Sequence, residues 1–162
     1  MRPMTKRILV AVDGSDAAIE AARFAAAEWP DASLTLLHVI NPADSATGAE
    51  GGFPGAVDQW YQSAHDRGGR ILKKAAAALD RDVETRLEVG RPTRAILDVA
   101  NGAKAVGSDD DADGDSGEDA DGIPFDHVVL ASQGRTGLSR VLLGSVAEGV
   151  VRRAEVPVTV VR

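Results

Sequence analysis

Five short runs of apolar, β-favouring residues are spaced along the chain, and a segment with helical periodicity separates each run from the next. The first run is ILVAV, Ile8 to Val12, and the last is VPVTVV, Val156 to Val161. Continuously apolar strands that alternate with helices are typical of a parallel sheet covered by helices on both faces. Because crossovers between parallel strands are right-handed, only doubly wound topologies remain. We therefore predict an α/β fold with an open five-stranded parallel sheet of order 3-2-1-4-5.

The intervening elements follow from the same periodicities. The three inner runs predict strands at Leu34–Ile40, Val83–Val89 and His127–Leu130. The helical segments are expected at Asp16–Trp29, Asp58–Leu79, Pro92–Ala100 and from Ser145 onward. Gly68 and Gly69 weaken the second of these helices by about 1 kcal/mol each relative to alanine. The Gly- and Pro-rich stretch from 41 to 57 is predicted to be a loop.

The charge of the chain is concentrated in one segment. Ser108 to Asp121 holds eight acidic residues and no basic one. Without these eight, 17 of the 25 acidic residues remain against 18 Lys and Arg, so the rest of the chain is close to neutral. A near-neutral surface argues against nucleic-acid binding through a broad basic field. We expect one domain over residues 1–162, with an acidic, disordered insertion at 107–122.

The acidic segment contains part of a calcium-binding motif. Asp109, Asp111, Asp113 and Gly114 match the first half of an EF-hand loop, but its twelfth position is Ala120 instead of glutamate. A solvated insertion is therefore favoured over a metal site. The chain has no cysteine and no apolar stretch of roughly 20 residues, so we expect a cytoplasmic protein without a membrane span.

Two turn-rich loops are expected to meet at one edge of the sheet. In the predicted order, the strand sequence reverses between strands one and four, and ligands bind outside the carboxyl ends of strands at such a reversal. Asp13-Gly14-Ser15 follows strand one, and ASQGRTGLSRVLLGSVAE, from Ala131, follows strand four. A binding pocket is therefore predicted between these two loops.

The second loop permits two interpretations. Gly134 and Gly144 allow positive φ and close approach of a ligand, and the amides at a helix beginning with Ser145 favour an anion such as phosphate. Alternatively, Ser145 and Glu148 form a capping box, and Asp13-Gly14 is an ordinary turn. The residues alone leave both interpretations open.

Catalytic motifs are absent. The sequence has neither GxGxxG nor GxxxxGK[ST], and His38, His65 and His127 show no metal-ligand or triad spacing. His38 is expected to be a core residue, because it lies within an apolar strand. We predict no catalytic residue and no metal ligand.

Three stretches carry a family resemblance: KRILVAVDGSDAAIEAARFA, LTLLHVINP and ASQGRTGLSRVLLGSVAEGVVRRAEVPVTVVR. They resemble the universal stress protein family along the whole chain apart from the acidic insertion. The resemblance implies a Rossmann-like fold of the adenine nucleotide alpha hydrolase type. The ATP-binding branch has the signature glycine, two residues, glycine, nine residues, glycine, then serine or threonine. Gly134, Gly144 and Ser145 match it, and Ala131 replaces its first glycine.

The resemblance also implies a ligand, ATP, with Mg²⁺ or Mn²⁺ as its possible companion. It assigns contacts with the ribose, adenine and phosphates to Asp13, the Val39 backbone, Ala131, Gly134, Gly144, Ser145 and the Val146 amide. Ala131 adds a methyl group where the family brings bare backbone against the nucleotide, and Ala11 stands where proline is common. Since alanine is the smallest replacement for glycine, we expect ATP binding to be retained.

The expected function is that of a stress-response regulator or dimeric switch that binds ATP. The family often dimerises through its last strand, so a homodimer through Val156–Val161 is expected. Two alternatives remain at this stage. One is a nucleotide-free, chaperone-like dimer in which the glycine loop is only architecture. The other is a slow ATP hydrolase.

Overall fold

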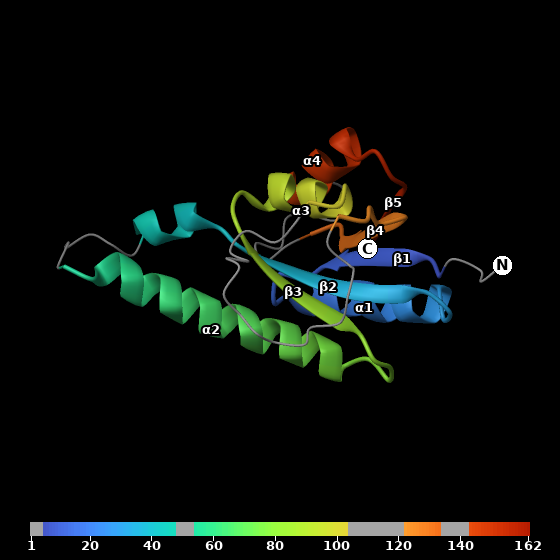
Figure 1. The fold of residues 1–162 in the computed structure, drawn as a ribbon, viewed down its shortest axis with the longest axis horizontal. Coiled ribbons are helices and arrows are strands. Elements are labelled where there is room, and N and C mark those ends of the chain that lie inside the picture. Colours follow the sequence, from blue (N-terminus) through green and yellow to red (C-terminus); the bar gives the residue numbers. More distant parts are fainter. Residues whose placement is uncertain (1–4, 48–53, 104–121, 134–142) are drawn as a thin grey trace.

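A five-stranded parallel sheet forms the centre of the molecule, and its order is β3-β2-β1-β4-β5 (Figure 1). The computed structural model describes residues 5–47, 54–103, 122–133 and 143–162. The strands are β1 Arg7–Ala11, β2 Ser33–Ile40, β3 Glu84–Val89, β4 His127–Ala131 and β5 Val158–Val161. The predicted α/β fold and strand order are confirmed.

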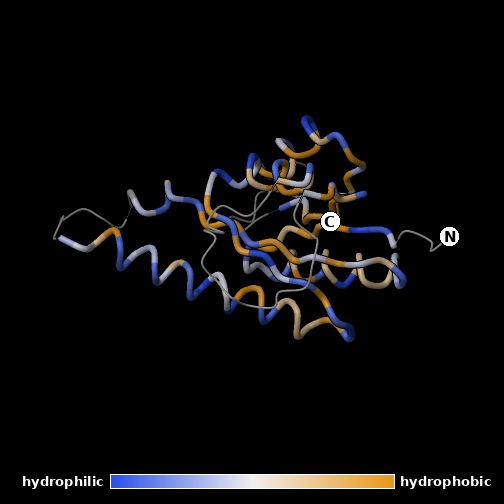
Figure 2. Tube along the Cα trace, viewed as in Figure 1, coloured by the Kyte–Doolittle hydropathy of each residue, from blue (hydrophilic) through white to orange (hydrophobic). Residues whose placement is uncertain are grey.

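Helices lie on both faces of the sheet. They are α1 Asp16–Glu28, the 3₁₀ helix η1 Pro42–Thr47, α2 Ala56–Ala77, α3 Pro92–Ala100 and α4 Ser145–Arg153. Helices α1 and α2 cover one face, and α3 and α4 cover the other (Figure 1). The strands alternate between the two cores: Ile8 and Val10 pack toward α1 and α2, and Leu9 packs toward α3 and α4. Figure 2 accordingly shows the central strands as largely hydrophobic.

Most predicted elements differ from the observed ones by one or two residues at an end, and the largest differences concern the predicted loop, α2 and the last strand. The stretch expected to be a loop contains η1 and the first two residues of α2, which spans Ala56–Ala77 instead of Asp58–Leu79. The last strand begins at Val158 instead of Val156, because Pro157 has no amide to donate to the ladder. The carbonyl of Pro157 still accepts a hydrogen bond from the amide of Val128 at 3.0 Å.

Close packing explains one glycine within α2. A Cβ atom at Gly68 would lie 2.7 Å from Leu87 Cδ1 and 3.0 Å from His38 Cδ2. A Cβ atom added at the adjacent Gly69 would meet no atom of another element within 4 Å. His38 is buried, and its Nδ1 lies 2.8 Å from the carbonyl oxygen of Val12, which confirms the predicted core role. Gly68 therefore allows α2 to approach the imidazole of His38 and the side chain of Leu87.

The two chain segments that flank residues 104–121 lie against each other. Gly102 has a positive φ of 89°, and a Cβ atom there would lie 3.0 Å from Pro124 N and 3.1 Å from Gly122 C. Arg7 Nη1 donates a hydrogen bond to the carbonyl oxygen of Ile123 at 2.6 Å. The acidic segment and its EF-hand-like half motif lie outside the described residues. No helix in the described ranges is long and apolar enough to cross a membrane.

Candidate functional site

A pocket of about 380 Å³ opens at the carboxyl ends of β1, β2 and β4. It lies where the strand order reverses between β1 and β4, which is where the predicted fold placed a binding site. Its other walls come from η1, from the first half of α3 and from the first turn of α4. The pocket contains six of the seven predicted site residues: Asp13, Val39, Ala131, Gly144, Ser145 and Val146. The seventh, Gly134, lies outside the described residues.

Asp13 lies two residues after the end of β1 and is held by the turn that begins α1. Its Oδ1 accepts hydrogen bonds from the Ser15 amide at 3.0 Å and from the Ser15 hydroxyl at 2.5 Å. Ser15 is the N-cap of α1, since its Oγ also accepts a hydrogen bond from the Ala18 amide at 3.2 Å. Gly14 completes the turn with a φ of 90°. Asp13 therefore belongs to a structural turn and also lines the pocket with a fixed orientation.

An apolar slot forms the second part of the pocket. Leu37 and Val39 of β2 line one wall, and Pro92 and Ile96 of α3 line another. Leu37, Val39 and Ile96 pack within or against the core on the α3 face of the sheet. Asp44 of η1 also lines the pocket. A slot between apolar walls is suited to a flat ring with polar edges.

The loop after β4 is fixed at both of its described ends. The amide of Ser132 donates to the carbonyl oxygen of Val161 at 2.8 Å, and the amide of Gly144 donates to the carbonyl oxygen of Ser132 at 2.7 Å. Gly144 has φ −60° and ψ 158°, an extended conformation that any residue adopts. Gly144 therefore does not use the positive φ that a glycine permits. Gly144 still lines the pocket, and because glycine has no side chain, a ligand can approach its backbone there.

The N-terminus of α4 reaches the pocket without a side-chain cap. Gly144 occupies the N-cap position, so Ser145 is the first helical residue. Glu148 Oε1 instead pairs with Arg152 Nη2 at 2.8 Å. The capping box considered from the sequence is therefore not formed, because the helix begins one residue too early for it. Within the described chain, amides at this helix terminus are left to water or to a ligand, and the helix dipole favours an anion.

Several residues of the pocket were not predicted from the sequence. Asp44 and Ile96 line it, as do Ser132 and Gln133 directly after β4. A signal existed for Pro92, since a proline at a helix start after β3 marks a loop on the same sheet edge. No local signal identified Asp44, because η1 reaches the pocket only through the path of the folded chain. In the described ranges, no three His, Asp or Glu side chains gather into a metal site.

The fold defines a Rossmann-like α/β protein with a pocket at the switch point of its sheet. The chain belongs to the universal stress protein family, whose model matches residues 4–106 and 118–162. The residues between these two ranges, 107–117, lie in the acidic segment.

Named relatives agree with this assignment. Universal stress protein MJ0531 of Methanocaldococcus jannaschii is 29% identical over 160 residues, which cover 97% of this chain and 82% of that protein. A universal stress protein of Thermus aquaticus is 32% identical over 161 residues, covering 98% of this chain and all of that protein. Universal stress protein Rv2005c of Mycobacterium tuberculosis is 32% identical over 164 residues. The match covers 95% of this chain and 47% of Rv2005c, so the chain spans about half the length of that relative.

Solved structures share the fold. Protein MJ0577 superposes with a TM-score of 0.64 at 26% identity, covering 98% of this chain and 96% of that one. The universal stress protein UspA of Lactobacillus plantarum gives 0.62 at 26% identity, covering 99% of this chain and all of that one. A universal stress protein in complex with cAMP gives 0.53 at 24% identity, with 99% of each chain covered.

Proposed function

We propose that this protein binds an adenine nucleotide, ATP in the first instance, in the pocket at the β1/β4 switch point, and that it acts as a stress-response regulator. The observation that carries the proposal is the joint placement of three features in one pocket. These are the oriented carboxylate of Asp13, the apolar slot between β2 and α3, and the N-terminus of α4 without a side-chain cap. The volume of about 380 Å³ lies within the range of roughly 300–1,000 Å³ that is typical of small-molecule sites.

Each part of the nucleotide has a chemically suitable partner. The base enters the slot beside Val39, whose backbone offers one donor and one acceptor at the end of β2. Asp13 accepts hydrogen bonds from the ribose hydroxyls. The phosphates lie at the N-terminus of α4, against Gly144, Ser145 and the Val146 amide. Ala131 faces the same pocket from the end of β4, and Gly134 remains a proposed phosphate contact from the family signature.

A divalent cation fits this arrangement only as a companion of the phosphates. The described lining residues include two carboxylates, Asp13 and Asp44. Two carboxylates are too few to bind a cation by themselves, and in the described ranges no three His, Asp or Glu side chains gather into a metal site. Mg²⁺ is commonly bound through one or two carboxylates together with substrate phosphates. Mg²⁺ or Mn²⁺ therefore enters the proposed site with the nucleotide, next to Asp13.

Known structures add limited support for a nucleotide. One protein of this fold was solved in complex with cAMP, which contains adenine, ribose and phosphate. That likeness concerns the fold, so the proposal for this chain depends on its own pocket residues.

The edge strand β5 supports a homodimer as part of the proposal. β5 pairs with β4 on one side, and in the described chain no strand pairs with its other side. Its residues Val158 to Val161 are all partly exposed. Sheet edges with apolar residues commonly need cover, and a second copy of β5 would supply it. Sedimentation equilibrium is expected to give twice the monomer mass.

Extraction of the purified protein tests the proposed function. We expect adenine nucleotide to be released on denaturation and identified by chromatography, and ATP with Mg²⁺ to bind in calorimetry. Asp13→Ala and Gly144→Val are expected to abolish most of this binding. Valine adopts the backbone conformation of Gly144, so that variant should fold. Asp31→Ala, an exposed site between α1 and β2, is the matched control. If ATP neither co-purifies nor binds at millimolar concentration, the proposal fails.

A further inference from the structure

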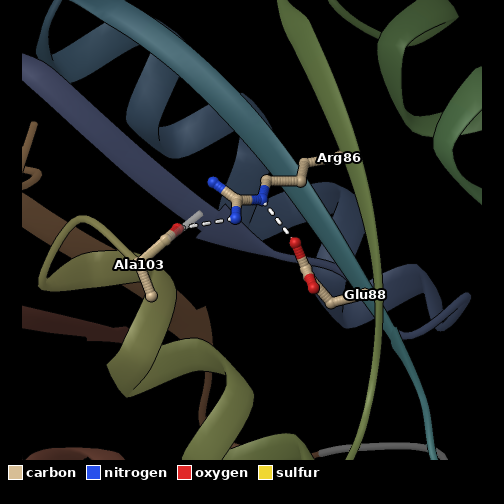
Figure 3. Close-up of polar contacts among 3 residues, drawn as sticks. All are labelled: Arg86, Glu88 and Ala103. Carbon is tan, nitrogen blue, oxygen red and sulfur yellow. Dashed lines mark hydrogen bonds and ion pairs between the residues drawn. The ribbon is translucent and has the colours of Figure 1, made fainter. Parts of the chain in front are cut away.

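A buried ion pair lies on the edge strand β3. Arg86 Nε lies 2.6 Å from Glu88 Oε1, and the two side chains are only 15% and 5% exposed. The two residues are separated by one position on the strand, so their side chains share one face of the sheet. Arg86 Nη2 also donates a hydrogen bond to the carbonyl oxygen of Ala103 at 2.8 Å (Figure 3). Because the cost of desolvating two charges offsets their attraction, this pair is weak evidence for a stabilising role.

The pair flanks the apolar slot of the pocket. Arg86 is the register partner of Leu37 in β2, and Glu88 is the register partner of Val39. Register partners in a parallel sheet point to the same face, so the pair stands beside the two side chains that form the β2 wall of the slot. Neither charged residue lines the pocket itself.

The same pair is connected to the opposite wall of the slot through α3. Ala103 follows the C-terminal end of α3, and its amide donates to the carbonyl oxygen of Asp98 at 2.9 Å. The bond from Arg86 to Ala103 therefore attaches the last turn of α3 to β3. The other end of α3 follows Gly90, whose amide donates to the carbonyl oxygen of Ile40 at 2.9 Å. Ile96, in the middle of this nine-residue helix, lines the slot.

We propose that Arg86 and Glu88 are positioning residues for nucleotide binding, which fix α3 relative to β2 and thereby set the width of the slot for the base. Glu88 orients the guanidinium of Arg86, whose planar fork then directs a second N–H to the Ala103 carbonyl. Release of that contact lets the C-terminal end of α3 move and displaces Ile96 with it. This inference rests on the proposed function, because it assigns the slot to the base of the nucleotide.

Three variants separate positioning from simple stability. The double variant Arg86→Met, Glu88→Met removes both charges together, so that neither is left buried without the other. Glu88→Gln keeps an oxygen that accepts the Nε–H of Arg86. Arg94→Ala, Asp98→Ala removes an exposed ion pair from the outer side of the same helix, with side chains 82% and 55% exposed, and serves as the control.

Two measurements are made on each full-length protein. The first is hydrogen exchange of the α3 peptide without any ligand, with α4 as the internal reference. The second is the affinity for Mg²⁺-ATP, measured by calorimetry well below the melting temperature of every variant. If the pair is merely structural, its replacement changes the melting temperature and leaves the affinity of the fully folded protein unchanged.

We expect the double variant to accelerate exchange in α3 relative to α4 and to weaken ATP binding by about fivefold or more. Glu88→Gln should keep most of the wild-type affinity. The control variant Arg94→Ala, Asp98→Ala should match wild type in both measurements. Unchanged exchange in α3 overturns the inference, and so does faster exchange with unaltered affinity. If wild type binds no nucleotide, the proposed function fails, while the exchange experiment still decides whether the pair holds α3.

Discussion

The two adjacent glycines of α2 provide a sharp test of the packing described above. Gly68 is buried against β2 and β3, whereas Gly69 is exposed, and a Cβ atom added there would meet no other atom within 4 Å. Replacing either glycine by alanine improves helix propensity by about 0.8–1.0 kcal/mol. Gly69→Ala is therefore expected to raise the free energy of unfolding by nearly this amount.

Gly68→Ala gains the same propensity but meets two neighbours. Its methyl group would lie 2.7 Å from Leu87 Cδ1, which moves by side-chain rotation, and 3.0 Å from His38 Cδ2. His38 yields less easily, because its Nδ1 contacts the Val12 carbonyl at 2.8 Å. Overpacking of a core costs about 1–3 kcal/mol. The net expectation is a destabilisation of about 1 kcal/mol.

Urea unfolding of the two variants, followed by circular dichroism, measures both effects. Equal m-values ensure that the midpoints report stability. We expect the two substitutions to change the free energy of unfolding in opposite directions. If Gly68→Ala stabilises the protein as much as Gly69→Ala does, α2 does not approach His38 and Leu87 as described, and the packing argument is wrong.

Three further predictions concern the site, one histidine and the acidic segment. Ala131→Gly should tighten ATP binding about fivefold in calorimetry, since one methyl group leaves the pocket wall; unchanged affinity would show that this methyl does not meet the ligand. Burial, and secondarily the charge of Lys6, lowers the pKa of His127 from its ordinary 6.5, so the unfolded chain takes up the proton first. Stability should therefore be level above pH 6.5 and fall as the pH drops below it, more steeply in wild type than in His127→Gln; parallel urea titrations would contradict this. Replacing residues 104–121 by a short Gly-Ser linker should preserve the fold and its urea midpoint, because Gly102 already contacts Gly122 and Pro124; loss of cooperative unfolding would refute it.

Most of the fold could be predicted from the sequence because its signals are local. Each strand is a short apolar run bounded by turn residues, and the alternation with helices leaves few topologies. The exceptions depended on contacts between distant segments. The role of Gly68 followed from its distance to His38 and Leu87, and the late start of β5 followed from the missing amide of Pro157.

The candidate site could be predicted only in part. Ala131 ends β4, and Asp13 lies two residues after the end of β1, so topology alone predicted both in one pocket at the reversal point. Asp44 and Ile96 line the pocket because of the path of η1 and the packing of α3 on the sheet, which no local pattern encodes. The capping-box interpretation was wrong because α4 begins at Ser145, after Gly144 is bound to Ser132.

A titration with Mg²⁺-ATP, followed by backbone amide resonances, tests the central claim most directly. The pocket predicts that the amides of Asp13, Val39, Ser145 and Val146 shift together with one apparent affinity. The resonances of amides near the amino-terminal ends of the strands, such as those of Trp29 and His127, should remain unchanged. Shifts confined to these amides, or no shifts at saturating ATP, would contradict the assignment of this pocket as the nucleotide site.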